Sequence, residues 1–228
     1  MPKSTAPPAA ITLQAVNLQY QNKPILQSLS LSFAPRGISF LMGENGAGKT
    51  QMLRCIHGLS TPNSGHISAP PIEQQAFLQQ IPILLNRSVL ANLRFIRGCP
   101  MAPAAHFDRE FANVIERFTL GDLLSQAALT LSGGQRKRLA AARLFLQQAN
   151  CYLLDEPGAN IDQHNSRLIE SAIQQRVDSG AKAIVTTHDF FQLQRLFRPG
   201  RDEMIIIKNG QLAATSRHPD SELLRRYL

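Results

Sequence analysis

Cysteine is scarce in this chain of 228 residues, and long apolar runs are missing from it. The three cysteines, Cys55, Cys99 and Cys151, lie far apart and form no CxxC pair. This spacing argues against a disulfide framework or a zinc site, so we expect three reduced thiols, mostly buried. No stretch approaches the roughly 18 apolar residues of a membrane-spanning helix, and the N-terminus lacks the apolar core of a signal peptide. The sequence therefore predicts a protein that is made and kept in the cytoplasm.

The balance of charge is basic, with a formal net charge of +8. Such a surface could attract nucleic acid, anionic lipid or acidic ligands. The densest cluster, residues 136–138, directly follows a motif described below, and the other basic residues are scattered. We interpret the excess as solvated charge with some attraction to a phospholipid surface and predict no nucleic-acid partner.

Strand-like and helix-like patterns follow one another along the chain. Residues 1–10 are rich in proline and alanine and predict a disordered N-terminal tail. Strands are predicted at residues 11–20, 29–33, 38–42, 151–154 and 183–187, with a hairpin at 204–215. Helices are predicted within residues 88–147, at 162–179, up to 197 and at the end of the chain, with Ser88, Ser132 and Asp162 as N-caps. Strands that flank an all-helical insert predict an α/β core with a helical subdomain.

A glycine-rich loop lies between the predicted strand at 38–42 and a helical pattern. It fits GxxxxGK[ST] and consists of Gly43, Glu44, Asn45, Gly46, Ala47, Gly48, Lys49 and Thr50. Glycines let the backbone wrap around phosphates with its N–H groups pointing inward, and the helix that follows adds its positive N-terminal dipole. We expect Lys49 to meet the β- and γ-phosphates and the Thr50 hydroxyl to ligate Mg²⁺.

Two adjacent acids, Asp155 and Glu156, end the predicted strand at 151–154. Ligands of open α/β sheets bind at this carboxyl edge. Since a phosphate loop needs such a partner, we expect Asp155 to hold the Mg²⁺ and Glu156 to orient and polarise the attacking water.

A second helix N-terminus suited to an anion begins at Ser132. Ser132 is a good N-cap, and Gly133, Gly134 and Gln135 follow it. Bare N–H groups and the helix dipole favour an anion there. The chain already has one phosphate loop, so these residues alone leave open which anion the second terminus meets.

The segment Leu131–Gln135, LSGGQ, resembles the signature of the ATP-binding cassette (ABC) family, and other motifs agree with that family in order and spacing over nearly the whole chain. Tyr20, 23 residues before Gly43, is similar to the aromatic residue that stacks on adenine. The segment Gly158–Asp162 resembles the loop through which two cassettes touch.

Two further residues resemble the family's γ-phosphate sensors. Gln80, with its neighbour Gln79 as the alternative, is similar to the glutamine that senses Mg²⁺ and the γ-phosphate. His188, 33 residues after Asp155, is similar to the histidine that clamps the γ-phosphate and the catalytic glutamate.

The resemblance implies a P-loop NTPase fold with a RecA-like core, an antiparallel β subdomain and a helical subdomain at approximately residues 82–147. The ATPase domain would span residues 11–228. ATP and Mg²⁺ would be bound, with catalytic roles for Lys49, Glu156 and His188 and metal contacts from Thr50, Gln80 and Asp155. Two chains, expected to be identical, would close head to tail around two ATP molecules, so each nucleotide would also meet Ser132, Gly133, Gly134 and Gln135 of the other chain.

Two residues depart from the family pattern. Gln51 replaces the small hydroxyl residue that usually follows the Mg²⁺ ligand, which leaves the usual α-phosphate contact at this position in doubt. Ala159 replaces a frequent serine in the contact loop, which affects signalling between the two sites. Neither change removes a residue needed for hydrolysis.

Transport is the function that the resemblance favours. Gln80 and Leu131 are 51 residues apart with no heptad pattern, unlike the split cassettes of DNA repair. The chain holds one cassette, whereas the translation type holds two. We therefore expect a peripheral ATPase at the cytoplasmic face of the inner membrane, paired with a separate permease.

The cargo follows from a shorter resemblance. Residues 82–93 resemble the segment after the glutamine loop of tungstate-type oxyanion importers, and Leu84 and Leu85 are expected to line a groove for a permease helix. We expect import of tungstate or a related oxyanion, with a periplasmic or extracellular substrate-binding protein that acts through the permease. The alternatives are the ATPase of a small exporter or lipid-release system, and a soluble regulatory ATPase.

Overall fold

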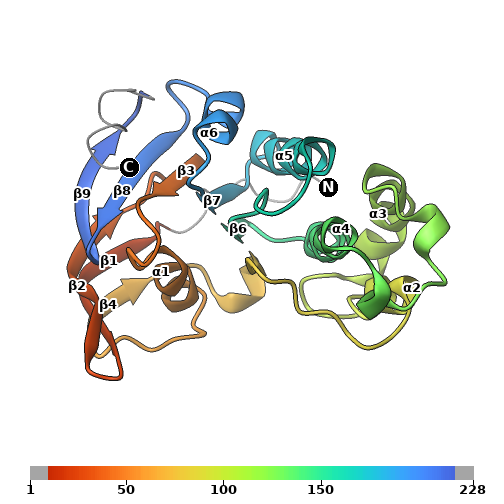
Figure 1. Cartoon of the computed structure of the whole chain (residues 1–228), viewed down its shortest axis with the longest axis horizontal. Helices are drawn as coiled ribbons and strands as arrows, with labels where there is room; N and C mark the ends of the chain where they lie inside the picture. Colours follow the sequence, from red (N-terminus) through yellow and green to blue (C-terminus); the bar gives the residue numbers. More distant parts are fainter. Residues whose placement is uncertain (1–9, 219–228) are drawn as a thin grey trace.

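The apolar run at residues 38–42 forms a strand at the centre of a six-stranded sheet. This computed structural model describes residues 10–218 (Figure 1). The strands of the sheet, in spatial order, are β5 (Gln75–Leu78), β6 (Cys151–Asp155), β7 (Lys182–Thr186), β3 (Gly37–Met42), β8 (Glu203–Lys208) and β9 (Gln211–Ser216). The first five are parallel and β9 is antiparallel to β8. All ligand-facing loops that follow the parallel strands therefore open at one edge.

A smaller antiparallel sheet packs against one face of this core. Its spatial order is β2 (Lys23–Ser32), β1 (Thr12–Tyr20) and β4 (Ser64–Ser68). Its apolar side chains share a cluster with α1 (Lys49–Ile56) and with one face of the large sheet, including Leu41, Leu153 and Ile205. The alternation at residues 29–33 predicted only part of β2. The strand begins six residues earlier, and few of the side chains in this first part are buried.

Helices cover the other face of the large sheet. Alternate residues of β3, namely Ile38, Phe40 and Met42, join a cluster with the helices that follow residue 88. These helices are α2 (Val89–Arg94), α3 (Ala104–Arg117), α4 (Gly133–Phe145), α5 (Gln163–Asp178) and α6 (Phe190–Leu196). Short 3-10 turns lie at Ile72–Gln74, Gly121–Leu123 and Ala128–Thr130. Figure 1 shows α2, α3 and α4 together at one end of the molecule, beside the strand edge formed by β5 and β6.

The N-caps that local sequence predicts are confirmed. The side chains of Ser88, Ser132 and Asp162 accept hydrogen bonds from backbone N–H groups of the first turns of α2, α4 and α5. The sequence pattern missed β5, a strand of four residues, which is too short to display a period. The predicted helix at the end of the chain and most of the predicted tail lie outside the described residues.

Within residues 10–218, no helix combines the length and the apolar character that crossing a bilayer requires. The three cysteines are free, and Cys55 and Cys151 are buried as expected. Burial raises the pKa of Cys55 to about 11 and that of Cys151 to about 12. Both thiols are therefore protonated at neutral pH and inert.

A buried charge network lies where the central strands begin. Lys182 is 2% exposed, and its Nζ donates to Ser39 Oγ over 2.5 Å. The carboxylate of Glu203 lies 3.9 Å from this nitrogen and also accepts from the Ser39 hydroxyl. Because burial disfavours the ammonium form, the pKa of Lys182 falls to about 8, although Glu203 opposes the shift.

We predict that Lys182→Met changes how the free energy of unfolding depends on pH. The folded pKa of about 8 lies below the unfolded value of 10.5. Between these values the unfolded chain binds more protons, so the contribution of Lys182 to stability rises with pH, by about 3 kcal/mol over the interval. Urea denaturation of both proteins at about pH 7.5 and about pH 10 measures the effect. If the difference in unfolding free energy between the two proteins is the same at both pH values, the prediction is refuted.

Candidate functional site

The glycine-rich loop runs from the end of β3 to the start of α1. Its path needs glycine at two positions in particular. Gly43 has φ +143°, and a Cβ there would lie 2.1 Å from the carbonyl oxygen of Ile207. Gly48 has φ +99°, and a Cβ there would lie 2.8 Å from Leu26 Cδ2 and 2.9 Å from the carbonyl oxygen of Ile25. Backbone packing against β8 and β2 therefore holds the loop in one shape.

Lys49 extends back across the loop that precedes it. Its Nζ donates to the carbonyl oxygens of Gly43 (2.6 Å) and Glu44 (2.9 Å). Burial lowers the pKa of Lys49, while the carboxylates of Glu156 and Asp155 act in the opposite direction. The loop thus presents a mostly buried cation held only by neutral oxygens, an arrangement that suits an incoming phosphate.

The acids at the end of β6 meet the loop from the other side. Asp155 Oδ2 accepts from the Thr50 hydroxyl over 2.9 Å, and Asp155 Oδ1 accepts from the Thr186 hydroxyl over 2.7 Å. Thr50 and Asp155 therefore place a hydroxyl oxygen and a carboxylate oxygen together. No group of three or more His, Cys, Asp or Glu gathers anywhere in the described part of the chain. This oxygen pair fits Mg²⁺, which binds proteins through one or two such ligands and completes its shell with phosphate and water.

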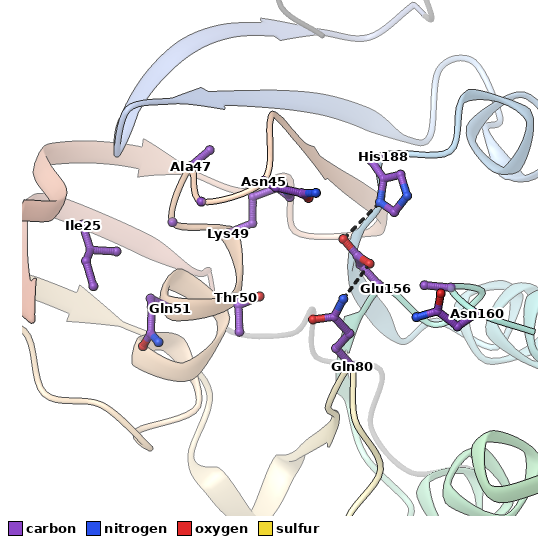
Figure 2. Close-up of a pocket in the computed structure, with 13 residues that line it drawn as sticks. Ile25, Asn45, Ala47, Lys49, Thr50, Gln51, Gln80, Glu156, Asn160 and His188 are labelled. Carbon is purple, nitrogen blue, oxygen red and sulfur yellow. Dashed lines mark hydrogen bonds and ion pairs between the residues drawn. The ribbon is translucent and has the colours of Figure 1, made fainter. Parts of the chain in front are cut away.

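The carboxylate of Glu156 is held at both of its oxygens (Figure 2). Gln80 Nε2 donates to Oε2 over 2.9 Å, and His188 Nδ1 lies 3.1 Å from Oε1. The backbone N–H of Glu156 donates to the Thr186 hydroxyl, and its φ of +45° is rare for a residue with a side chain. The sequence left Gln79 and Gln80 as alternatives, and Gln80 is the residue that contacts Glu156.

A cleft joins these groups. Of the residues expected from the sequence, it is lined by Asn45, Gly46, Ala47, Gly48, Lys49, Thr50, Gln51, Gln80, Glu156 and His188. Gly43, Glu44 and Asp155 lie behind this lining, in contact with Lys49 and Thr50. Ile25, Ala159 and Asn160 also line the cleft. Sequence reasoning missed Ile25 because the visible alternation of β2 begins four residues after it.

Two expected nucleotide contacts lie outside this cleft. Tyr20, the last residue of β1, is 66% exposed and is not part of the lining. The signature residues Ser132–Gln135 form the N-terminus of α4, where the Ser132 and Gln135 side chains each bond the backbone of the other. Ser132 and Gly133 are exposed. The structure therefore brings together the phosphate loop, the acids, Gln80 and His188, and leaves the signature pointing elsewhere.

A second groove lies beside Gln80, between β5, α4 and the segment that follows Gln80. This groove, called the β5–α4 groove below, is lined by Phe77, Leu78, Gln79, Pro82, Ile83, Ile96, Ala140, Arg143, Leu144 and Gln147. Ile83 is 72% exposed, and its carbonyl oxygen accepts from Arg143 Nη1 over 3.0 Å. Leu84 and Leu85, which the sequence predicts to line a groove for a permease helix, are not part of this lining. Leu84 packs against the main core, and the backbone of Leu85 is bonded to the buried side chain of Asn92.

Comparison with known proteins agrees with this geometry. The sequence pattern of the ABC transporter family matches residues 26–159. The cytochrome c biogenesis ATP-binding export protein CcmA of Roseobacter denitrificans is 35% identical over 168 residues, which cover 72% of this chain and 77% of that protein. The aliphatic sulfonates import ATP-binding protein SsuB of Granulibacter bethesdensis is 31% identical over 206 residues, 90% of this chain and 82% of that protein. The nickel import ATP-binding protein NikO of Rhodobacter capsulatus is 28% identical over 239 aligned positions, 95% and 92% of the two proteins.

Solved structures share the fold. An ATP-binding subunit of an ABC transporter superposes with a TM-score of 0.83 at 22% identity, covering 96% of this chain and 92% of that one. A dimeric ATP-binding cassette in a post-hydrolysis state, bound to ADP and Pi, gives a TM-score of 0.77 at 19% identity, with 90% and 97% covered. The expected α/β ATPase fold with its antiparallel β subdomain is confirmed.

The mixed sheet with its glycine-rich loop and paired acids defines a nucleotide-binding ATPase of the ABC class. Because the family pattern covers more than half of the chain and the relatives align along most of it, the chain belongs to the ABC transporter family. It is an ATP-binding and ATP-hydrolysing subunit of such a transporter.

We predict that Gln80→Ala lowers ATP turnover by about 10–100-fold, because Glu156 loses one of the two side chains that fix its carboxylate. Gln79→Ala is the matched control, since it removes the same side chain one position away. In the isolated chain, steady-state phosphate release should be close to wild type for Gln79→Ala. Equal losses in the two variants would contradict the assignment of Gln80.

Proposed function

We propose that this chain hydrolyses Mg²⁺-ATP in the cleft and that Glu156 is the group that activates the water. The observation that carries the proposal is the clamping of the Glu156 carboxylate between Gln80 and His188, opposite the phosphate loop. A carboxylate fixed at both oxygens is suited to orient a water molecule and to accept its proton as the water attacks the γ-phosphorus.

The phosphate-facing roles follow from the same geometry. Lys49 exchanges its two loop carbonyls for β- and γ-phosphate oxygens, a stronger pairing because the acceptors are charged. Thr50 and Asp155 would hold Mg²⁺, and Gln80 is proposed as a third residue that contacts it. The metal supplies neutralisation of the charge on the transferred phosphoryl group. Tyr20 is proposed to stack on the adenine base, and Gln51 to lie near the α-phosphate.

A second cassette completes each site in this proposal. Ser132, Gly133, Gly134 and Gln135 cap α4 outside the chain's own cleft, which supports a role at the nucleotide of another chain. The related cassette bound to ADP and Pi is itself a dimer. Ala159 and Asn160, on the rim of the cleft, belong to the loop proposed to contact the second chain. We propose a homodimer that closes on ATP.

The β5–α4 groove is proposed as the permease contact. Ile81 and Ile83 are 79% and 72% exposed on the segment between Gln80 and α2. Apolar side chains so exposed favour a protein partner. Because the groove adjoins Gln80, a permease helix there would move the residue that holds Glu156. The proposed contact implies attachment to the cytoplasmic face of the membrane, and membership of the ABC transporter family argues against a regulatory ATPase without a membrane partner.

Import is the direction that the relatives favour. The sulfonate and nickel importers align with 90% and 95% of this chain, and the CcmA export protein with 72%. The higher identity of CcmA, 35%, keeps a small exporter as the second candidate. None of the relatives named above cites tungstate, so the resemblance of residues 82–93 alone supports that cargo. The sulfonate relative supports the broader class of oxyanions, delivered to the permease by a substrate-binding protein.

We predict that Glu156→Gln lowers ATP hydrolysis by about 10²–10⁴-fold, the usual contribution of a general base. Nucleotide binding should survive, because the phosphate loop is untouched, and ATP should trap the dimer. Phosphate release and size-exclusion chromatography with ATP measure the two effects. The double variant Lys49→Ala/Glu156→Gln is the control and should stay monomeric. Undiminished turnover in Glu156→Gln would exclude Glu156 as the base.

We predict that Ile83→Glu uncouples transport while basal ATP hydrolysis in the isolated chain stays within about twofold, since an exposed side chain costs little when replaced. Ile72→Glu, on an exposed apolar residue outside the groove, is the matched control. Transport in cells and co-purification of the permease should fall in Ile83→Glu and persist in Ile72→Glu. If Ile83→Glu leaves both intact, the permease binds elsewhere.

The permease and cargo can be identified together. Affinity purification of the tagged chain from native membranes, followed by mass spectrometry, should recover an integral membrane protein. Recovery should fall for Ile83→Glu and persist for Ile72→Glu. Uptake of radiolabelled molybdate, tungstate, sulfonate and nickel by cells that lack the permease then tests oxyanion import directly.

A further inference from the structure

Lys137 is a buried cation that no role above uses. It lies in the second turn of α4, is 3% exposed, and takes part in no ion pair within the described part of the chain. Its Nζ donates to two backbone carbonyl oxygens, those of Gln80 (2.8 Å) and Glu156 (3.0 Å). A buried ammonium group is costly, so it depends on these two bonds and on the nearby carboxylates of Asp155 and Glu156.

The two carbonyls belong to the residues that set the catalytic geometry. Gln80 and Glu156 are 76 residues apart in sequence, and their side chains bond each other directly. Lys137 adds a second connection between the same two residues, through their backbones. The ammonium group of Lys137 therefore holds in place the backbone that carries the Glu156 side chain.

The helix that carries Lys137 also carries the signature. Lys137 follows Ser132 by five residues in one continuous helix, about 7.5 Å along its axis. A shift of the α4 N-terminus against a bound phosphate must move Lys137 with it, because a hydrogen-bonded helix of this length moves as a unit. The same shift then reaches Gln80 and Glu156.

We propose that Lys137 is a positioning residue that fixes the backbones of Gln80 and Glu156 relative to α4. Through it, the nucleotide that a partner chain presents to the signature sets the geometry of Glu156 in this chain. The inference rests on the proposed dimer, and it adds a residue and a route by which one site responds to the other.

The neighbouring Arg138 provides the matched control. It lies on the same helix and also donates to backbone carbonyls, those of Phe118 and Thr119, but these belong to the segment after α3 and do not touch the cleft. A residue that only anchors α4 in the helical part of the molecule should behave as Arg138 does.

The test compares Lys137→Met, Lys137→Arg and Arg138→Met in the full chain. In Lys137→Met, kcat for ATP should fall by about 10²-fold, the loss that a misplacement of about 1 Å can cause, with KM within about twofold. Lys137→Arg keeps a cationic donor and should restore part of kcat. Arg138→Met should lower the melting temperature without lowering kcat. If Lys137→Met instead matches Arg138→Met, or if Lys137→Arg is no better than Lys137→Met, the positioning role is refuted.

A second measurement separates this inference from the proposed function and covers the case in which Lys137→Met folds poorly. Lys137→Gln retains a neutral donor in a shorter side chain, and it is combined with Glu156→Gln. The ATP concentration needed for dimerisation should rise at least about fivefold over Glu156→Gln alone, a coupling of ordinary size. If Glu156→Gln does not trap a dimer, the proposed function has failed. If it does and Lys137→Gln leaves the ATP requirement unchanged, only the role of Lys137 has failed.

Discussion

One hydroxyl group, that of Thr186 on β7, holds both acids of the cleft. It donates to Asp155 Oδ1 over 2.7 Å and accepts the backbone N–H of Glu156 over 2.8 Å. Thr186 is fully buried, and the parallel register of β6 and β7 sets it beside Asp155. The positive φ of Glu156 costs about 1–2 kcal/mol and persists because such contacts over-determine it. The carboxylates of Asp155 and Glu156 thus depend on a single pair of buried strands.

Local sequence rules predicted the parts of this structure that neighbouring residues decide. N-caps at Ser88, Ser132 and Asp162 need only a side-chain oxygen and the N–H groups of the next turn, and all three formed. The phosphate loop needs glycines at fixed offsets. The family resemblance then placed residues at the cleft that no local rule could assign, notably Gln80 and His188.

Contacts between residues far apart in the chain could not be predicted from the sequence. The choice between Gln79 and Gln80 depends on which side chain meets Glu156, 76 residues away. Ile25 was missed because its strand shows no alternation at that end. Ile83 was missed because an apolar run in a sequence does not indicate which of its residues faces the core. The basic excess was interpreted as solvated charge, yet Lys137 is buried against two carbonyls. Each of these depends on how separate segments pack.

The exposed cap of α4 has a genetic consequence in the proposed homodimer. Each nucleotide would take Lys49 from one copy and Ser132 from the other. A copy defective at Lys49 and a copy defective at Ser132 are each inactive as homodimers. Paired together, they assemble one site that carries both defects and one that carries neither. Two inactive alleles would therefore restore partial activity in the same cell. One allele with both defects would instead place a defect in each site of every dimer that contains it, so all of these dimers would be inactive.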